Sequence, residues 1–149
     1  MADTRVRKAS SSDPALRWFR RGRQDLRLAD AIDGSDGVAM TVGFARYAAG
    51  ESNEWVMSYD EALVVTRGRF AVDSDGGSTE AAVGEVIYLS PDTPVTYRAI
   101  EESEVVYVSY PHWYDATARS PHAARLAEFA EEVGVGDVVD VSDSGGDRG

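Results

Sequence analysis

The stretch of residues 55–68, WVMSYDEALVVTRG, constrains the fold of this chain more than any other segment. Its large side chains fall on alternate positions, which is typical of a β-strand with two unlike faces. The residues that share this spacing are Trp55, Met57, Tyr59 and Glu61. Gly68 predicts a turn into a second strand over residues 70–73. We therefore expect a hairpin whose first strand, residues 55–66, carries an acid on its aromatic face.

Short β-like runs recur along the rest of the chain, separated by turns rich in Gly, Pro and Asp. Strands are expected over residues 27–32 (an edge strand), 38–47, 78–83, 85–89, 95–100 and 104–110. So many short strands indicate a sandwich or a barrel. The 149 residues are enough for one all-β domain with its own core.

The two ends of the chain depart from this pattern. Ser120 followed by Pro121 predicts the start of a helix, because serine caps a helix and proline suits its first position. Leu126 and Phe129 follow at helical spacing, and Gly134 predicts the end. The predicted organisation is a basic, partly disordered arm (1–27), a β-barrel (28–118), a C-terminal helix (119–134) and an acidic disordered tail (135–149).

Charge is unevenly distributed along the chain. The formal net charge is −11, yet residues 1–27 hold eight of the 15 basic residues and three of the 26 acidic residues. An acidic body repels phosphate backbones, so no nucleic-acid binding is expected. The basic arm either binds an acidic partner or pairs with the acidic face of its own domain.

The chain has no cysteine, and none of its apolar runs approaches the roughly 20 residues that a membrane-spanning helix needs. It therefore has no disulfide framework, and its first residues do not form an apolar signal segment. We expect a soluble, cytoplasmic protein that binds no membrane.

Two motifs together resemble those of the cupin superfamily. In the first, Glu61 is separated by six residues from Gly68. In the second, Gly84 and Glu85 open an apolar strand that runs into a turn ending at Pro94. The resemblance covers roughly residues 38–112. It implies a small jelly-roll β-barrel and a homodimer.

The metal ligands of that superfamily have no counterparts here. Metal-binding cupins place two His six and four residues before the Glu, and a third just after the turn of the second motif. The corresponding residues are Trp55, Met57 and Val95. Neither Trp nor Val ligates a metal, and a thioether is a poor ligand for hard divalent ions. We therefore expect no metal and no other cofactor.

Within the superfamily, the chain is most similar to the ethanolamine-utilisation cupins of the EutQ type, which also lack the His set. The similarity rests on the pattern W-x3-Y-D-E-x6-G, on GEVIYLSP and on the closing YVSYPHW. This resemblance implies a link to acetate kinase activity. The sequence itself has no Gly-rich phosphate loop, which counts against nucleotide chemistry.

Glu61 is the candidate catalytic residue, together with Tyr59. A carboxyl against aromatic walls has its pKa raised by desolvation, which suits a general acid or base. Tyr59 shares the parity of Glu61 and is placed to hold a substrate oxygen or donate a proton. Alternatively, Glu61 is bonded to Arg46, Tyr59 or Tyr97 and only fixes the barrel geometry.

The expected substrate-binding residues are Trp55, Met57, Val95, Tyr97, Arg46 and Tyr107. An inward Arg46 would recognise a carboxylate, although an outward orientation is the alternative. Asp60 should face outward, because neighbouring strand residues point to opposite faces. His112 and His122 are not at a metal-ligand spacing, and His112 is expected to close the barrel mouth or contact a partner chain.

Three functions are compatible with the sequence. The first is metal-independent acid–base catalysis (isomerase, lyase, dehydratase or cyclase type) on a small organic metabolite in an aromatic pocket. The second is a non-catalytic small-molecule-binding module, or an assembly module that joins a complex through its Arg-rich arm. The third, from resemblance alone, is an acetate-kinase-like role.

Overall fold

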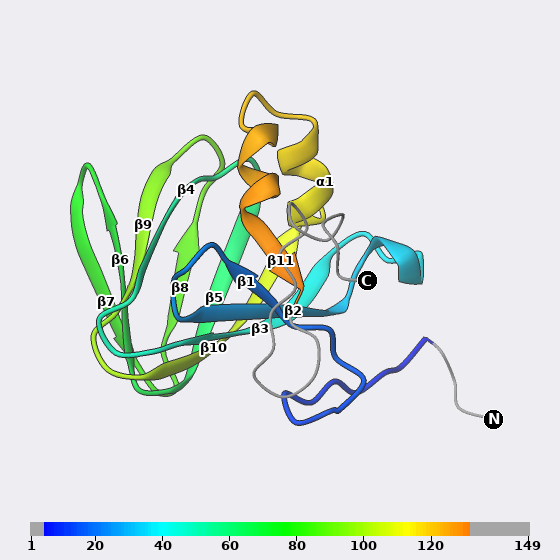
Figure 1. The fold of residues 1–149 in the computed structure, drawn as a ribbon, viewed down its shortest axis with the longest axis horizontal. Coiled ribbons are helices and arrows are strands. Elements are labelled where there is room, and N and C mark those ends of the chain that lie inside the picture. The colour runs from blue at the N-terminus through cyan, green and yellow to red at the C-terminus, as the bar shows by residue number, and fades with distance from the viewer. Residues whose placement is uncertain (1–4, 132–149) are drawn as a thin grey trace, which may run out of the picture.

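A computed structural model describes residues 5–131, which form two antiparallel β-sheets packed face to face (Figure 1). The seven-stranded sheet has the order β11-β1-β2-β3-β10-β5-β8. Its strands are β1 (Phe19–Arg21), β2 (Leu26–Ile32), β3 (Thr41–Tyr47), β5 (Asp60–Arg67), β8 (Val86–Leu89), β10 (Ser103–Tyr110) and β11 (Phe129–Glu131).

The second sheet has four strands in the order β4-β9-β6-β7. These are β4 (Ser52–Val56), β6 (Arg69–Ser74), β7 (Gly77–Ala82) and β9 (Pro94–Ala99). Three short helical segments complete the described chain, namely η1 (Gly34–Asp36), α1 (Trp113–Ala118) and η2 (Ala123–Glu128). Of these, α1 and η2 contact each other at one end of the barrel (Figure 1).

The core lies between the two sheets. Buried and partly exposed residues alternate along β10, with the buried positions facing the opposite sheet. Phe70 on β6 and Val65 on β5 are each 1% exposed and belong to the same apolar cluster. The prediction of an all-β, single-domain jelly roll is confirmed. No helix between residues 5 and 131 is long and apolar enough to cross a membrane.

The prediction of one continuous strand over residues 55–66 is wrong. The chain leaves β4 at Val56 and enters β5 at Asp60, and these strands belong to different sheets. Between them, the backbone of Met57 is hydrogen-bonded to Asp92 and Thr93. The four alternating side chains nevertheless all point inward, with exposures of 4% for Trp55, 1% for Met57, 3% for Tyr59 and 6% for Glu61. A crossing between sheets preserves the inside face, so the spacing predicted burial correctly.

The predicted hairpin around Gly68 is also wrong. The strand before Gly68 pairs with β10 and β8, whereas the strand after it pairs with β7 and β9. Gly68 is therefore the point at which the chain passes from one sheet to the other. Its φ is +79°, and a Cβ there would lie 2.1 Å from the carbonyl oxygen of Glu102. Only glycine fits this crossing without strain.

The N-terminal segment is part of the barrel sheet from Phe19 onward. Strand β1 pairs with β2 and with β11. Strand β2, which was expected at an edge, is consequently internal. Arg17 forms an ion pair with Glu131 at 2.6 Å. Within the described residues, the basic arm thus pairs with acids of its own chain.

The C-terminal region differs from the single helix predicted over residues 119–134. The α-helix lies earlier, at Trp113–Ala118, and a short 3-10 segment follows at Ala123–Glu128. Phe129–Glu131 form strand β11. The ring of Phe129 packs against Trp55 and Trp113, so strand pairing and aromatic contacts override the helical spacing. Residues 132–134 and the predicted tail (135–149) lie outside the described part of the chain.

Gly68→Ala is expected to lower the free energy of unfolding by at least about 2 kcal/mol, because a left-handed conformation and a backbone clash act together. Urea unfolding measures this. The matched control is Gly76→Ala, where the nearest atom to a new Cβ is 3.9 Å away. Equal stability of the two variants would contradict the crossing role of Gly68.

Candidate functional site

Glu61 lies near the start of β5 and points into the barrel. The hydroxyl of Tyr97, from β9 in the opposite sheet, donates a hydrogen bond of 2.7 Å to its Oε1. Burial raises the pKa of Glu61 to about 7, although the hydrogen bond from Tyr97 opposes the shift. Glu61 is therefore a buried carboxyl that changes its charge close to neutral pH.

A cavity of about 50 Å³ lies beside this carboxyl. Its lining includes Tyr47, Trp55, Tyr59, Glu61, Tyr97 and Tyr107. The walls are mostly aromatic, and several ring hydroxyls supply polar groups. Ligand pockets usually measure about 300–1,000 Å³, so the cavity in this conformation has room for a few water molecules but not for a metabolite.

Tyr59 accepts a hydrogen bond of 2.9 Å from the indole Nε1 of Trp55. Burial, and then the charge of Glu61, raise its pKa well above the ordinary value for tyrosine. Burial likewise raises the pKa of Tyr97 and Tyr107. The cavity therefore combines one carboxyl that titrates near neutrality with hydroxyls that stay protonated.

The structure brings most of the predicted site residues together. The five that line the cavity are Trp55, Tyr59, Glu61, Tyr97 and Tyr107. Met57 and Val95 are buried in the core but do not line it. The sulfur of Met57 lies 3.3 Å from the Tyr97 hydroxyl, whose hydrogen is donated to Glu61, so Met57 packs against a residue that lines the cavity. The catalytic and binding roles of all these residues stay predictions.

The prediction that Arg46 lines the pocket is wrong. On β3 it lies between Ala45 and Tyr47, both of which line the cavity, so alternation turns Arg46 outward. Its guanidinium pairs with Glu104 at 3.0 Å and lies 4.4 Å from the ring centre of Trp18. Asp60, in contrast, is exposed as predicted, and it accepts a hydrogen bond from Tyr88.

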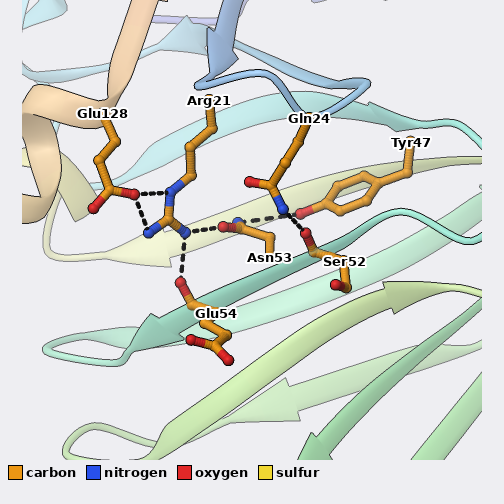
Figure 2. Close-up of polar contacts among 7 residues, drawn as sticks. All are labelled: Arg21, Gln24, Tyr47, Ser52, Asn53, Glu54 and Glu128. Atoms are coloured by element: carbon orange, nitrogen blue, oxygen red, sulfur yellow. Dashed lines mark hydrogen bonds and ion pairs between the residues drawn. The ribbon is translucent and has the colours of Figure 1, made fainter.

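Arg21 is a buried residue that the sequence did not single out. Figure 2 shows its guanidinium between Glu128 on one side and Asn53 with the backbone of Glu54 on the other. Nε and Nη2 lie 2.7 and 2.6 Å from Oε1 of Glu128. The guanidinium also lies 5.2 Å from the ring centre of Trp55. Asn53 and Trp55 line the cavity, so Arg21 contacts two residues of the cavity wall.

Asp30 on β2 is a second carboxyl that the sequence reasoning missed. It accepts hydrogen bonds from the Tyr107 hydroxyl and from the indole Nε1 of Trp113. Burial is the main cause that raises its pKa. The absence of a side chain at Gly43 makes room for the ring of Tyr107, because a Cβ there would lie 2.3 Å from its Cζ. The only local signal was an acid within a short strand, which does not reveal burial.

A larger groove of about 1,060 Å³ lies outside the cavity, between the N-terminal segment, η1 and α1. Leu28, Trp113 and Phe129 line both spaces and therefore form the wall between them. His112 lines the groove, where its Nδ1 lies 3.1 Å from the Thr41 hydroxyl and its Nε2 contacts the carbonyl of Val38.

The donor groups do not fit a metal. The indole nitrogen of Trp55 donates a hydrogen bond to Tyr59, and the sulfur of Met57 lies against the hydroxyl of Tyr97. Between residues 5 and 131, no group of three or more His, Cys, Asp or Glu side chains is arranged to hold an ion. The cavity therefore presents a single carboxylate where three further ligands would be needed.

The two packed sheets around an aromatic cavity give the chain the fold of the cupins. An RmlC-like cupin from Shewanella frigidimarina NCIMB 400 superposes with a TM-score of 0.58 at 12% identity, over 70% of this chain and 92% of that one. The family described as "Ethanolamine utilisation protein EutQ" matches residues 20–115, and the chain belongs to that family.

The chain is also similar to two proteins that carry the EutQ name. The structure of the Clostridium difficile EutQ protein has a TM-score of 0.60 at 19% identity, and the match covers 68% of this chain and 72% of that one. The "Acetate kinase EutQ" of Escherichia coli (strain K12) is 26% identical over 84 residues. That match covers 56% of this chain but only 36% of the relative, so the chain corresponds to a minor part of its length.

Glu61→Gln is expected to stabilise the protein increasingly as pH rises. The pKa of Glu61 is about 7 in the folded state and 4.5 in the unfolded state, so the folded state binds the proton more tightly. The wild-type protein therefore loses stability as pH rises from 4.5 to 7. Above pH 7 the variant should gain roughly 3 kcal/mol in unfolding free energy over the wild type, at about 1.4 kcal/mol per pKa unit. Urea unfolding at pH 5, 6, 7 and 8 measures the gap; a gap that does not change with pH would contradict burial of the charge.

Proposed function

We propose that the protein is a metal-independent cupin that binds a small, partly apolar organic metabolite, and that Glu61 transfers a proton in catalysis. The supporting observation is a buried carboxyl with a pKa of about 7 that faces an aromatic cavity. Near neutral pH, such a group is present in both protonation states, which suits a general acid or base.

The proposed roles of the tyrosines follow from their contacts. Tyr97 donates a hydrogen bond to Glu61 and so stabilises its carboxylate form, which is the form that accepts a proton from the substrate. Tyr59 keeps its own proton and already receives one hydrogen bond from Trp55, so its hydroxyl hydrogen is available to hold a substrate oxygen. A carboxyl base with a neutral donor nearby serves isomerisation, elimination, dehydration or cyclisation.

A non-catalytic binding module is the second candidate. One observation favours it, because Tyr97 already satisfies Oε1 of Glu61, as expected of a carboxyl that only fixes the barrel geometry. An assembly role for the Arg-rich arm has less support. Two arginines of the arm form ion pairs within the same chain, Arg17 with Glu131 and Arg21 with Glu128.

An acetate-kinase-like role is the third candidate, and it rests on the Escherichia coli relative alone. The match covers a minor part of that protein, and the cavity beside Glu61 offers no cluster of basic side chains for phosphates. An assay with acetate, ATP and Mg²⁺ tests this role directly. Formation of acetyl phosphate would replace the acid–base proposal.

We also infer a cytoplasmic homodimer. Strand β8 is an edge of the seven-stranded sheet, and its outward residues Val86 and Tyr88 are 58% and 63% exposed. Neighbouring Val83 is 60% exposed. An apolar edge of this kind is suited to pair with a second copy.

The test of the catalytic proposal begins with mass spectrometry of metabolites that co-purify with the protein, followed by turnover assays on the compounds found. Glu61→Gln should reduce kcat by about 10²–10⁴-fold, the usual contribution of a positioned acid or base. The matched control is Asp60→Asn, since Asp60 neighbours Glu61 on β5 but is exposed. Full turnover in Glu61→Gln would leave the binding module as the better description.

A further inference from the structure

The C-terminal segment places a carboxylate and an aromatic ring against the cavity wall. Glu128 pairs with the guanidinium of Arg21, and the ring of the next residue, Phe129, packs against both Trp55 and Trp113, which also contact each other. The ring centres lie 5.9 and 5.6 Å apart from those two indoles. The guanidinium of Arg21 lies 5.9 Å from the Phe129 ring. One cation and two indoles thus bind a carboxylate and a ring at the same time.

Arg21 is built as a fixed anion receptor. It is 5% exposed and is the only Lys or Arg that is buried between residues 5 and 131. Asn53 and the carbonyl of Glu54 hold its Nη1 from within the barrel (Figure 2). The edge formed by Nε and Nη2 is left facing the C-terminal segment, and this edge suits a carboxylate.

The group that occupies this receptor is held weakly by comparison. The side chain of Glu128 is 49% exposed, whereas that of Arg21 is 6% exposed. Neither η2 nor β11 contains a buried residue. The segment is held by the three-residue pairing of β11 with β1 and by the partly buried Leu126 and Phe129, and β11 lies at the edge of the sheet. An edge segment with few buried contacts can leave without unfolding the barrel.

We propose that Arg21 anchors the carboxylate of an organic acid whose apolar or aromatic body replaces the Phe129 ring, and that Glu128 and Phe129 occupy this subsite in the ligand-free state. A neutral ligand would leave a buried guanidinium without a counter-charge, which is strongly unfavourable. The incoming molecule must therefore carry its own negative charge. This inference rests on the proposed small-molecule function and specifies its ligand class.

Displacement of Phe129 would also make the cavity large enough for a metabolite. The inner space of about 50 Å³ and the outer groove of about 1,060 Å³ share Leu28, Trp113 and Phe129 as their common wall. Once the Phe129 ring moves out, a ligand held at Arg21 extends along Trp55 toward Glu61 and the tyrosine hydroxyls. The anchor and the titrating carboxyl then face the same bound molecule.

The test uses 3-phenylpropionate, which joins a ring and a carboxylate, and isothermal titration calorimetry. The double variant Glu128→Gln, Phe129→Ala should bind it roughly tenfold more tightly than the wild type, because the competing side chains have been removed. The uncharged 3-phenylpropionamide should gain nothing. The matched control is Glu80→Gln, which removes the acid from the exposed Arg69–Glu80 pair and should leave affinity unchanged.

Arg21→Gln, added to the double variant, should abolish the gain. If that triple variant does not fold, the comparison of acid with amide in the double variant decides the same question. The catalytic proposal is tested by turnover of Glu61→Gln and this inference by calorimetric binding to the Glu128→Gln, Phe129→Ala variant, so a failure of one is separable from a failure of the other. Equal affinity for acid and amide, or no gain in the double variant, would overturn the inference.

Discussion

The hydrogen bond between Tyr97 and Glu61 joins the two sheets across the interior of the barrel, and much of the site depends on it. A carboxyl with 6% exposure is costly to bury, and here a hydroxyl from the opposite sheet offsets part of that cost. The remaining cost appears as a pKa of about 7. The burial that makes the charged form of Glu61 unfavourable thus gives the core a carboxyl that exchanges a proton near neutral pH.

The sequence predicted the composition of this interior well and its connections poorly. Alternation marked Trp55 and Glu61 as inward residues, because the pleat imposes that spacing in either sheet. The same alternation does not report where one strand stops and the next begins, so the passage from β4 to β5 went unseen. Gly68 correctly predicted a turn. A hairpin and a crossing between sheets can both require glycine at such a turn, so the residue type does not distinguish them.

The residues that sequence reasoning missed are those whose environment is made by distant segments. Arg21 resembles the other arginines of the arm until β1 pairs with β11 and turns it inward. Asp30 is partly buried because Trp113 and Tyr107 reach it from distant parts of the chain. Arg46 was misplaced because a strand with both faces covered gives no clue to which face is the cavity. Long-range pairing, not local pattern, decides these positions.

The pairing of β1 with β11 brings the first and last described strands together, and it has a consequence for how the protein is made. During synthesis, all strands from β1 to β10 leave the ribosome before the segment that carries Glu128 and Phe129. Until that segment has been made, β1 lacks one of its two neighbouring strands and Arg21 lacks the carboxylate of Glu128. The subsite that we propose at Arg21 is therefore the last part of the barrel to form, because β11 both turns Arg21 inward and carries the ring that packs on Trp55.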